Sequence, residues 1–225
     1  FAEWKGETMT TDPVYINFGC GFSTGRSWRN YDFSLTLRFE RLPVIGRVFT
    51  KNARRFPAEV MYGDVTRRPL APPNTVDAAF ASHVLEHLPR ESMTAALENT
   101  LDMLKPGGVF RLIVPDLKTR TAAYMADESP EAAEAYIQPL KMGQPRRPQG
   151  VLGRLSRLYG GVGHRWMYDE PAMRAALAAA GFVSIRRCEM GDSDIAAFAE
   201  VEHEGRFIDS RFGAELAMEG RKPAA

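Results

Sequence analysis

Short apolar runs, bounded by glycine, proline or polar residues, recur through the first half of the chain. Runs of this length predict strands, here at 14–18, 58–62, 76–81 and 109–114, with a further short strand at 27–32. The run 76–81 is almost continuously apolar, which is typical of a parallel strand covered on both faces. Helices are predicted at 44–54 and 91–104, the second ending at Lys105-Pro106-Gly107-Gly108. This alternation predicts a parallel sheet with right-handed crossovers.

The alternation breaks after residue 116. Two helical stretches, 117–127 and 130–142, lead into a segment rich in proline and glycine. A helix at 170–180, a strand at 182–189, an acidic loop and a last strand at 213–219 complete the chain. The acidic loop contains Asp192, Asp194, Glu200, Glu202 and Glu204. We therefore expect one domain over 1–225, with an insert or lid at about 117–167.

Composition narrows the classes of function. With 225 residues, 44% of them hydrophobic, the chain is long enough for one well-buried core. A formal charge of +1 argues against nucleic acid as a partner, because duplex readers usually carry a strongly basic domain. No apolar run approaches the roughly 18 residues of a membrane-spanning helix. Cys20 and Cys188 fit no zinc or redox spacing, so a reduced, cytoplasmic setting is expected.

The first predicted strand runs directly into Gly19-Cys20-Gly21. Glycines at this point bring bare backbone to the carboxyl edge of the sheet, where α/β folds bind small ligands. A tight turn without a ligand is the alternative. Asp32 ends the second predicted strand, and one carboxylate there accepts hydrogen bonds from both ribose hydroxyls. Its alternative role is to cap the following turn.

Four histidines are candidates for acid–base or metal chemistry. His83 and His87 would share one helix face, with Glu86 beside them. The order His-x-x-Glu-His is not the zinc-protease pattern and the sequence offers no third ligand, so no metal is predicted. His87 is predicted to be structural and His203 to lie on the surface. His164, in a glycine-rich loop, is our first choice for a general base or acceptor contact; packing against Trp166 is its alternative role.

The insert is locally basic. Between Ala135 and Tyr168 there is no acidic residue, whereas the positive charges are Lys141, Arg146, Arg147, Arg154, Arg157 and Arg165. Arginine favours bidentate contact with phosphate or carboxylate, so Arg154, Arg157, Arg165 and Trp166 are predicted to bind an anionic acceptor. One alternative places 151–159 amphipathically on an anionic membrane face. Another pairs the arginines of the insert with the acidic loop at 189–209.

Taken in order, these motifs resemble those of class I S-adenosylmethionine-dependent methyltransferases. The landmarks are Asn17–Gly21, Asp32, Gly63-Asp64, Ser82–Leu88, Leu104–Gly108 and Ala180–Phe182. The resemblance is closer still to small bacterial predicted methyltransferases that accompany surface-polysaccharide synthesis genes, through Trp28–Asp32, Val114–Asp116 and His164–Tyr168.

The resemblance implies a Rossmann-like, doubly wound α/β fold with a seven-stranded, mostly parallel sheet whose last strand is antiparallel. It implies S-adenosylmethionine as cofactor, held by Phe18, Gly19, Cys20, Gly21, Asp32, Asp64, Val65, Ser82 and His83. In that pattern Asp32 holds the ribose, Asp64 accepts from the adenine amino group, and Ser82 and His83 face the sulfonium. One departure is that only ten residues separate Gly21 from Asp32, too few for the usual helix.

The expected function is methylation of an oxygen, less readily a nitrogen, on a sugar or glycan-type acceptor. The acceptor would carry phosphate or be linked to a nucleotide or lipid, and His164 and His83 are the catalytic candidates. A nicotinamide oxidoreductase is one alternative. However, Gly19-x-Gly21-x-x-x-Gly25 is one residue longer than the dinucleotide fingerprint, and no Tyr-x-x-x-Lys pair is present. A non-catalytic methyltransferase-like binding domain is the other alternative.

Overall fold

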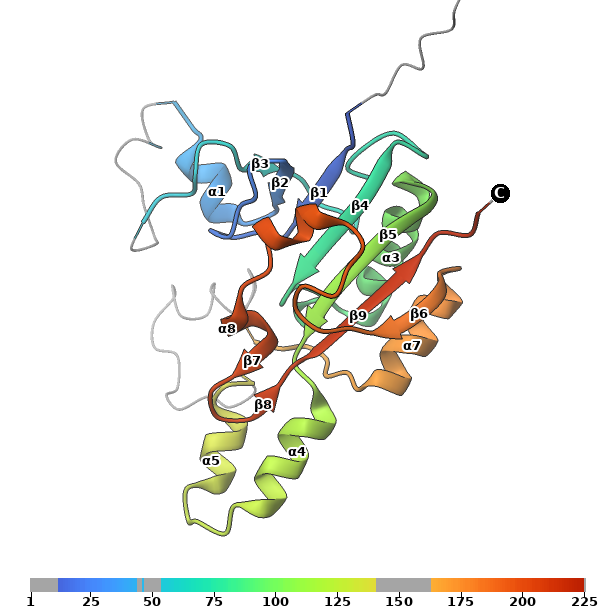
Figure 1. Cartoon of the computed structure of the whole chain (residues 1–225). Helices are drawn as coiled ribbons and strands as arrows, with labels where there is room; N and C mark the ends of the chain where they lie inside the picture. The colour runs from blue at the N-terminus through green and yellow to red at the C-terminus, as the bar shows by residue number, and fades with distance from the viewer. Residues whose placement is uncertain (1–11, 44–45, 47–53, 141–162, 225) are drawn as a thin grey trace, which may run out of the picture.

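The computed structural model describes residues 12–43, 46, 54–140 and 163–224. Its main sheet has seven strands in the order β3-β2-β1-β4-β5-β9-β6 (Figure 1). Their bounds are β1 Tyr15–Phe18, β2 Trp28–Asp32, β3 Met61–Tyr62, β4 Val76–Ser82, β5 Leu104–Val114, β6 Val183–Arg187 and β9 Leu216–Arg221. Only β9 runs antiparallel, between β5 and β6. The predicted α/β fold, with its mostly parallel sheet and antiparallel last strand, is confirmed.

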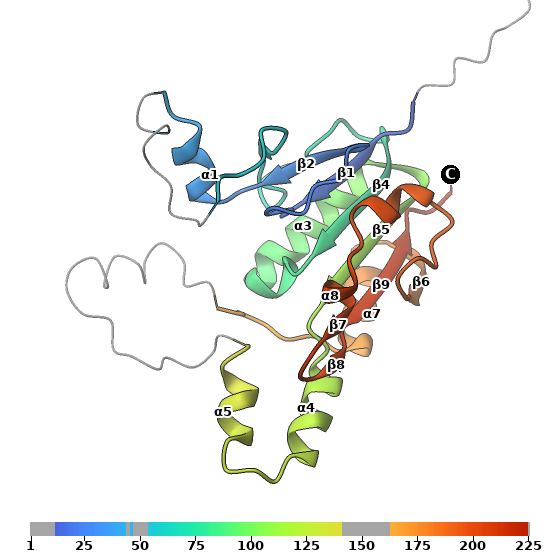
Figure 2. The ribbon, with the colours of Figure 1, turned by 60° about the vertical axis from the view of Figure 1, so that its left-hand side comes forward.

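The two faces of the sheet are covered differently. Helices α3 (Arg90–Met103) and α7 (Glu170–Ala179) pack on one face, where Met93, Leu97 and Met173 contact the core. The other face is covered by the segment 188–207, which contains the short helices η2 (Ala196–Glu200) and α8 (Glu204–Phe207). Figures 1 and 2 show α3 and this segment on opposite sides of the sheet. We call residues 188–207 the covering segment.

The crossover from β1 to β2 contains no helix, as the short spacing to Asp32 predicted. Two buried asparagines hold it instead. The Asn17 side-chain amide donates to the Ser23 carbonyl at 2.9 Å and to Asn30 Oδ1 at 3.1 Å. Asn30 Nδ2 donates to the Gly25 carbonyl at 2.9 Å. These bonds satisfy the backbone of a turn that would otherwise bury unpaired polar groups.

The covering segment takes the place of the missing helix. Phe198, Val201 and Phe207 pack in one hydrophobic cluster with Trp28 and Phe80 of the sheet. The Trp28 indole N–H donates to the Ala197 carbonyl at 2.9 Å, which fixes the segment over β2. The same face of the sheet is therefore covered by residues that lie far from it in sequence.

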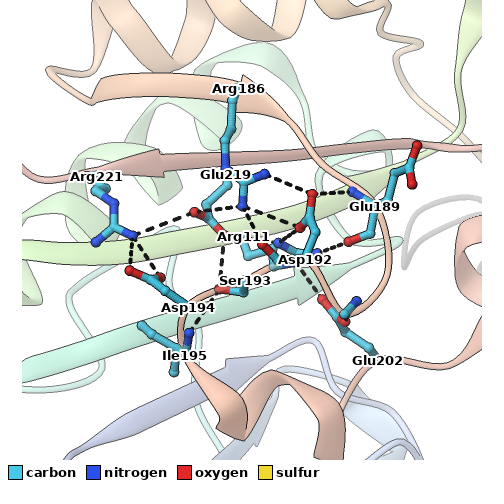
Figure 3. Close-up of polar contacts among 11 residues, drawn as sticks. Arg111, Arg186, Glu189, Asp192, Ser193, Asp194, Ile195, Glu202, Glu219 and Arg221 are labelled. Atoms are coloured by element: carbon cyan, nitrogen blue, oxygen red, sulfur yellow. Dashed lines mark hydrogen bonds and ion pairs between the residues drawn. The ribbon is translucent and has the colours of Figure 1, made fainter.

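A buried arginine anchors the covering segment. Arg111, in the middle of β5, is fully buried and pairs with Asp192 at 2.8 Å, Glu219 at 3.0 Å and Glu202 at 2.5 Å (Figure 3). Its Nη2 also donates to the Glu189 carbonyl. Because a buried charge is very costly without partners, these carboxylates must stay close to β5.

The acidic loop therefore pairs with arginines of the sheet. Besides Arg111, its described partners are Arg186, which contacts Asp192 at 2.8 Å, and Arg221, which contacts Asp194 at 2.8 Å. Arg120, at the start of the insert, pairs with Asp209 at 3.1 Å. The insert arginines at 146, 147, 154 and 157 lie outside the described residues, so their pairing with this loop stays a prediction.

The insert begins with an antiparallel helix pair, α4 (Leu117–Ala126) and α5 (Ala132–Ile137), which projects beyond the end of β5 (Figures 1 and 2). Asp116 caps α4 by accepting from the Lys118 N–H at 2.9 Å. Both helices are shorter than predicted. A two-stranded ribbon of β7 (Ile208–Asp209) and β8 (Gly213–Ala214) lies against α4.

Several predicted bounds are wrong. Helix α1 spans Leu35–Glu40 and begins where the Ser34 side chain accepts from the Thr36 N–H at 3.1 Å, a helix that the sequence pattern did not indicate. Most of the helix predicted at 44–54 falls outside the described residues. The stretch 105–108 was predicted as a break but forms the irregular start of β5, with Gly107 at φ +78°. Among the described residues no helix is long and apolar enough to cross a membrane.

We expect Arg111→Met to lower the free energy of unfolding by about 3–5 kcal/mol, because it leaves buried carboxylates without their cation. Urea denaturation measures this change. Lys118→Met, which removes an exposed lysine 3.8 Å from Asp169, is the matched control and should stay within about 0.5 kcal/mol. Equal small losses for both variants would contradict the anchoring role of Arg111.

The stability should also fall in acid. Partial burial works to raise the pKa of Asp192, but hydrogen bonds from Arg186, the Glu189 N–H and Arg111 outweigh it and lower this pKa to about 2. The unfolded state then binds more protons, so the stabilisation is present above about pH 4 and is lost as the pH falls toward 2. Asp192→Asn should flatten the fall in unfolding free energy over this range, which urea denaturation at successive pH values measures. An unchanged fall would contradict this role of Asp192.

Candidate functional site

The carboxyl ends of the parallel strands meet at one edge of the sheet. Their register pairs Phe18 with Tyr31, Asn17 with Phe80, Asp32 with Tyr62 and Ser82 with Ile113. The first residues past β1, β3 and β4 are Gly19, Gly63 and His83. The predicted site residues at the ends of these strands are therefore brought to one edge.

Asp32 contacts the glycine turn directly. Its Oδ2 accepts from the Gly21 N–H at 3.0 Å and its Oδ1 from the Ser34 N–H at 2.7 Å, so it also caps the following turn. Burial raises the pKa of this carboxyl, and the two N–H donors only partly oppose the rise. Each oxygen keeps a lone pair for a further donor. Both roles weighed for Asp32 from the sequence are thus compatible.

The glycine turn requires its glycines for two different reasons. Gly19 has φ +63°, and a Cβ there would lie 2.3 Å from Val84 Cγ2. Gly21 has φ +54°, and no atom lies within 4 Å of the position of its Cβ. The backbone of Gly21 therefore borders open space at which a ligand can approach. Phe18 and Cys20 turn their side chains into the protein, so a cofactor would reach only their main chain.

Cys20 is not a nucleophile at neutral pH. Burial and the nearby Asp32 charge raise the pKa of its thiol to about 12, so it stays protonated.

Asp64 lies just beyond β3 at the same edge. Its Oδ1 accepts from the Thr66 N–H at 3.0 Å and its Oδ2 pairs with the exposed Arg67 at 3.2 Å. The preceding Gly63 N–H donates to the Asp32 carbonyl at 3.1 Å, which links the two acidic positions. Val65 is buried in the core, so its side chain is not available to a cofactor.

A small cavity of about 10 Å³ lies behind the glycine turn. Its lining residues are Asn17, Gly19, Cys20, Ser23, Phe80, Ser82, Val201 and Arg206. The Ser82 hydroxyl is buried and has no hydrogen-bond partner among the described residues. The volume holds about one water, so a larger ligand must move the wall that Val201 and Arg206 form. That wall belongs to the covering segment.

His83 has a strained backbone, with φ +55°. Its Nε2 donates to the Arg206 carbonyl at 3.2 Å, and its Nδ1 lies 3.5 Å from Glu86 Oε1. Burial works to lower the pKa of this imidazole, but the Glu86 carboxylate outweighs burial and raises it. His83 thus links the end of β4 to the covering segment.

The structure brings His164 to the Glu86–His87 pair. Ligand atoms of these three residues lie within 4.8 Å of one another, and the two imidazole rings stand 5.0 Å apart. Glu86 itself is fully buried. The sequence prediction of no metal rested on the lack of a third ligand, and the fold removes that argument. His203 is exposed, as predicted, and is not among the residues of this cluster.

Arg165 and Trp166 follow directly and are exposed. The Trp166 N–H donates to the Glu86 carbonyl at 3.1 Å, and the Arg90 guanidinium stands over the indole at 4.9 Å. Arg90 was not predicted from the sequence. Arg154 and Arg157 lie outside the described residues.

Tyr168 is a further residue that the sequence reasoning passed over. Its hydroxyl is buried without a hydrogen-bond partner among the described residues. Burial raises the pKa of this phenol, with Arg90 opposing and Glu86 adding to the shift. Its only sequence signal was a place in the His164–Tyr168 landmark.

Comparison with known proteins decides the family. A family model described as "Methyltransferase domain" matches residues 16–186, which is most of the chain. The chain belongs to the methyltransferase domain family. Its methyl donor is S-adenosylmethionine, and the protein is an enzyme of that class. A search of the curated proteins finds no significant match.

Two methyltransferases are among the solved structures that resemble this chain. One is the complex between the Haloferax volcanii Trm112 methyltransferase activator and the putative methyltransferase, with 16% identity, a TM-score of 0.50, and 97% of this chain and 86% of the other covered. A Mesorhizobium loti S-adenosylmethionine-dependent methyltransferase has 17% identity and a TM-score of 0.46, with coverages of 92% and 90%. At 16% identity the likeness to the Haloferax volcanii complex concerns the fold alone.

The methyltransferase should lose S-adenosylmethionine affinity when Gly21 becomes Ala, because the substitution strains the turn and adds a methyl group where the ligand approaches. We expect at least about a tenfold weaker Kd, equivalent to about 1.4 kcal/mol, by isothermal titration. Gly107→Ala is the matched control, since Gly107 also has positive φ and open space around its Cβ but lies at the start of β5. A similar loss of affinity in both variants would argue against a cofactor site at Gly21.

Proposed function

We propose that this methyltransferase transfers a methyl group from S-adenosylmethionine to a hydroxyl oxygen of an anionic, sugar-type acceptor. The cofactor would lie along the strand ends. Its methionine part would contact the backbone of 18–21, with Asp32 at the ribose, Asp64 at the adenine amino group, and Ser82 with His83 near the sulfonium. The contact between Asp32 and the Gly21 N–H supports this placement, because it joins two of these positions at one edge.

The observation that carries the acceptor class is the exposed Trp166 beside the end of β4. Its main chain is held against Glu86, and its indole forms a cation–π pair with Arg90. An aromatic surface suits the apolar face of a sugar ring, while Arg90 and Arg165 suit a phosphate or carboxylate on it. The basic composition of the insert, including Arg154 and Arg157, points to the same anionic class.

Methyl transfer to a hydroxyl needs alignment, exclusion of water and loss of one proton. Oxygen forms a bond to the methyl carbon as the carbon–sulfur bond breaks, and S-adenosylhomocysteine and a proton are released. The His83 ring donates from Nε2 to the Arg206 carbonyl and brings Nδ1 to 3.5 Å from Glu86, which suits a cofactor contact better than a base. We therefore place proton removal at the corner formed by Glu86, His87 and His164.

The test is a screen of acceptors with S-adenosylmethionine labelled in its methyl group. Sugar phosphates, nucleotide-linked sugars and lipid-linked glycans form the anionic arms, and the same sugars without phosphate are the matched controls. We expect label in at least one anionic arm, with the neutral counterpart at least about tenfold poorer in kcat/KM. Turnover of neutral sugars alone, or of amines alone, would overturn the proposed acceptor.

Trp166→Ala should raise KM for the acceptor by about tenfold or more, because it removes the aromatic surface, and should leave the Kd of S-adenosylmethionine unchanged. Trp166→Phe keeps an aromatic ring and should retain most activity.

The double variant Arg154→Glu/Arg157→Glu should also weaken acceptor turnover and leave the Kd of S-adenosylmethionine unchanged. If cofactor affinity falls in parallel with turnover, these residues do not act on the acceptor.

A further inference from the structure

The Glu86 carboxylate is buried without a hydrogen-bond donor among the described residues. The side chain is fully buried, and neither carboxylate oxygen accepts a hydrogen bond from a described residue. The nearest ring nitrogens are His83 Nδ1 at 3.5 Å and His87 Nε2 at 3.8 Å from its Oε1. A buried carboxylate is strongly disfavoured without a cation or hydrogen-bond donors. The site therefore calls for a cation or for protons on its histidines.

The tautomer of His87 favours a bound cation. Its Nδ1 lies 3.3 Å from the Gly163 carbonyl, which can only accept, so Nδ1 carries a proton. In the neutral ring Nε2 then presents a lone pair on the side of Glu86. Two acceptors facing one another across 3.8 Å repel unless a cation lies between them. A backbone carbonyl on the distal nitrogen is also the usual support of a metal-binding histidine.

His164 is held in place by the backbone around it. Its own N–H donates to the Leu140 carbonyl at 3.2 Å. The next N–H, of Arg165, donates to the Glu86 carbonyl at 2.7 Å. These bonds fix the third ligand against the first two, so the cluster is pre-organised although it joins residues far apart in sequence.

We propose that Glu86, His87 and His164 bind one first-row divalent metal ion, with Zn²⁺ as the best match. Two imidazoles and one carboxylate suit Zn²⁺ and its neighbours far better than Mg²⁺, and three protein ligands leave a fourth position open. His83 acts as a positioning residue for the Glu86 carboxylate. Binding of the ion does not depend on the proposed methyl transfer. The catalytic role of the ion does rest on the proposed methyl transfer. In that role the open coordination position would take the acceptor hydroxyl and favour loss of its proton.

Metal binding is tested on the full chain after removal of metal with a chelator. Titration with Zn²⁺, and with Co²⁺ followed by its absorption spectrum, should give one site per chain without the bands of thiolate ligation. Mg²⁺ should not compete with Zn²⁺ for this site.

His164→Asn and Glu86→Gln should each weaken Zn²⁺ binding by at least about a hundredfold, and His83→Asn by about ten- to a hundredfold. Asparagine tolerates the positive φ at residue 83. His203→Asn, on the exposed fourth histidine, is the control and should bind as the unaltered chain does.

The shift in Tm on adding Zn²⁺ separates loss of the metal site from poor folding of a variant. Zn²⁺ should raise the Tm of the unaltered chain and of His203→Asn but not of His164→Asn. S-adenosylmethionine affinity, measured in chelator, should be the same in the unaltered chain, His164→Asn and His203→Asn, so failure of the metal site is distinguishable from failure of the proposed function. Absence of stoichiometric Zn²⁺ or Co²⁺ binding, or equal weakening by His203→Asn, would overturn the proposal and leave protonated histidines as the partners of Glu86.

Discussion

The in-register parallel pairing of β2, β1 and β4 is the constraint on which the rest of this structure depends. These strands end at the same edge of the sheet. Strand pairing alone therefore brings together Gly19–Gly21, Asp32 and Ser82-His83. The pairing survives a crossover that lacks a helix, because Asn17 and Asn30 satisfy the backbone of the turn. The crossover between β1 and β2 is therefore shorter than is usual in this fold, and the strand ends still meet at one edge of the sheet.

The missing helix has a consequence for the site. Its place over the sheet is taken by the covering segment, which Arg111 anchors through Glu202 and Asp192. The same segment supplies Val201 and Arg206 to the cavity wall, and the Arg206 carbonyl to His83. The element that completes the core therefore also borders the cavity at the strand ends. Arg111 thus holds in place a segment that forms part of this cavity wall.

The sequence predicted what depends on local pattern. Apolar runs located β1, β4, β5 and the end of the strand predicted at 58–62. The short interval after Gly21 correctly excluded a helix there. Helix α1 was missed because its start depends on one Ser34 contact rather than on periodicity. Arg111 was hidden inside an apolar strand, and nothing local indicated that its partners would come from the acidic loop. The approach of His164 to Glu86 was likewise invisible, because it depends on how the insert returns to the sheet.

Backbone amide hydrogen exchange, with and without S-adenosylmethionine, tests most directly whether the strand ends and the covering segment form one cofactor site. The account predicts slower exchange at 19–21, 32–34 and 82–83 on binding, together with altered exchange across 196–207 and none in α4 and α5. NADH should leave all of these amides unchanged. The account would be contradicted if protection were confined to another part of the chain, or if exchange across 196–207 were the same with and without S-adenosylmethionine.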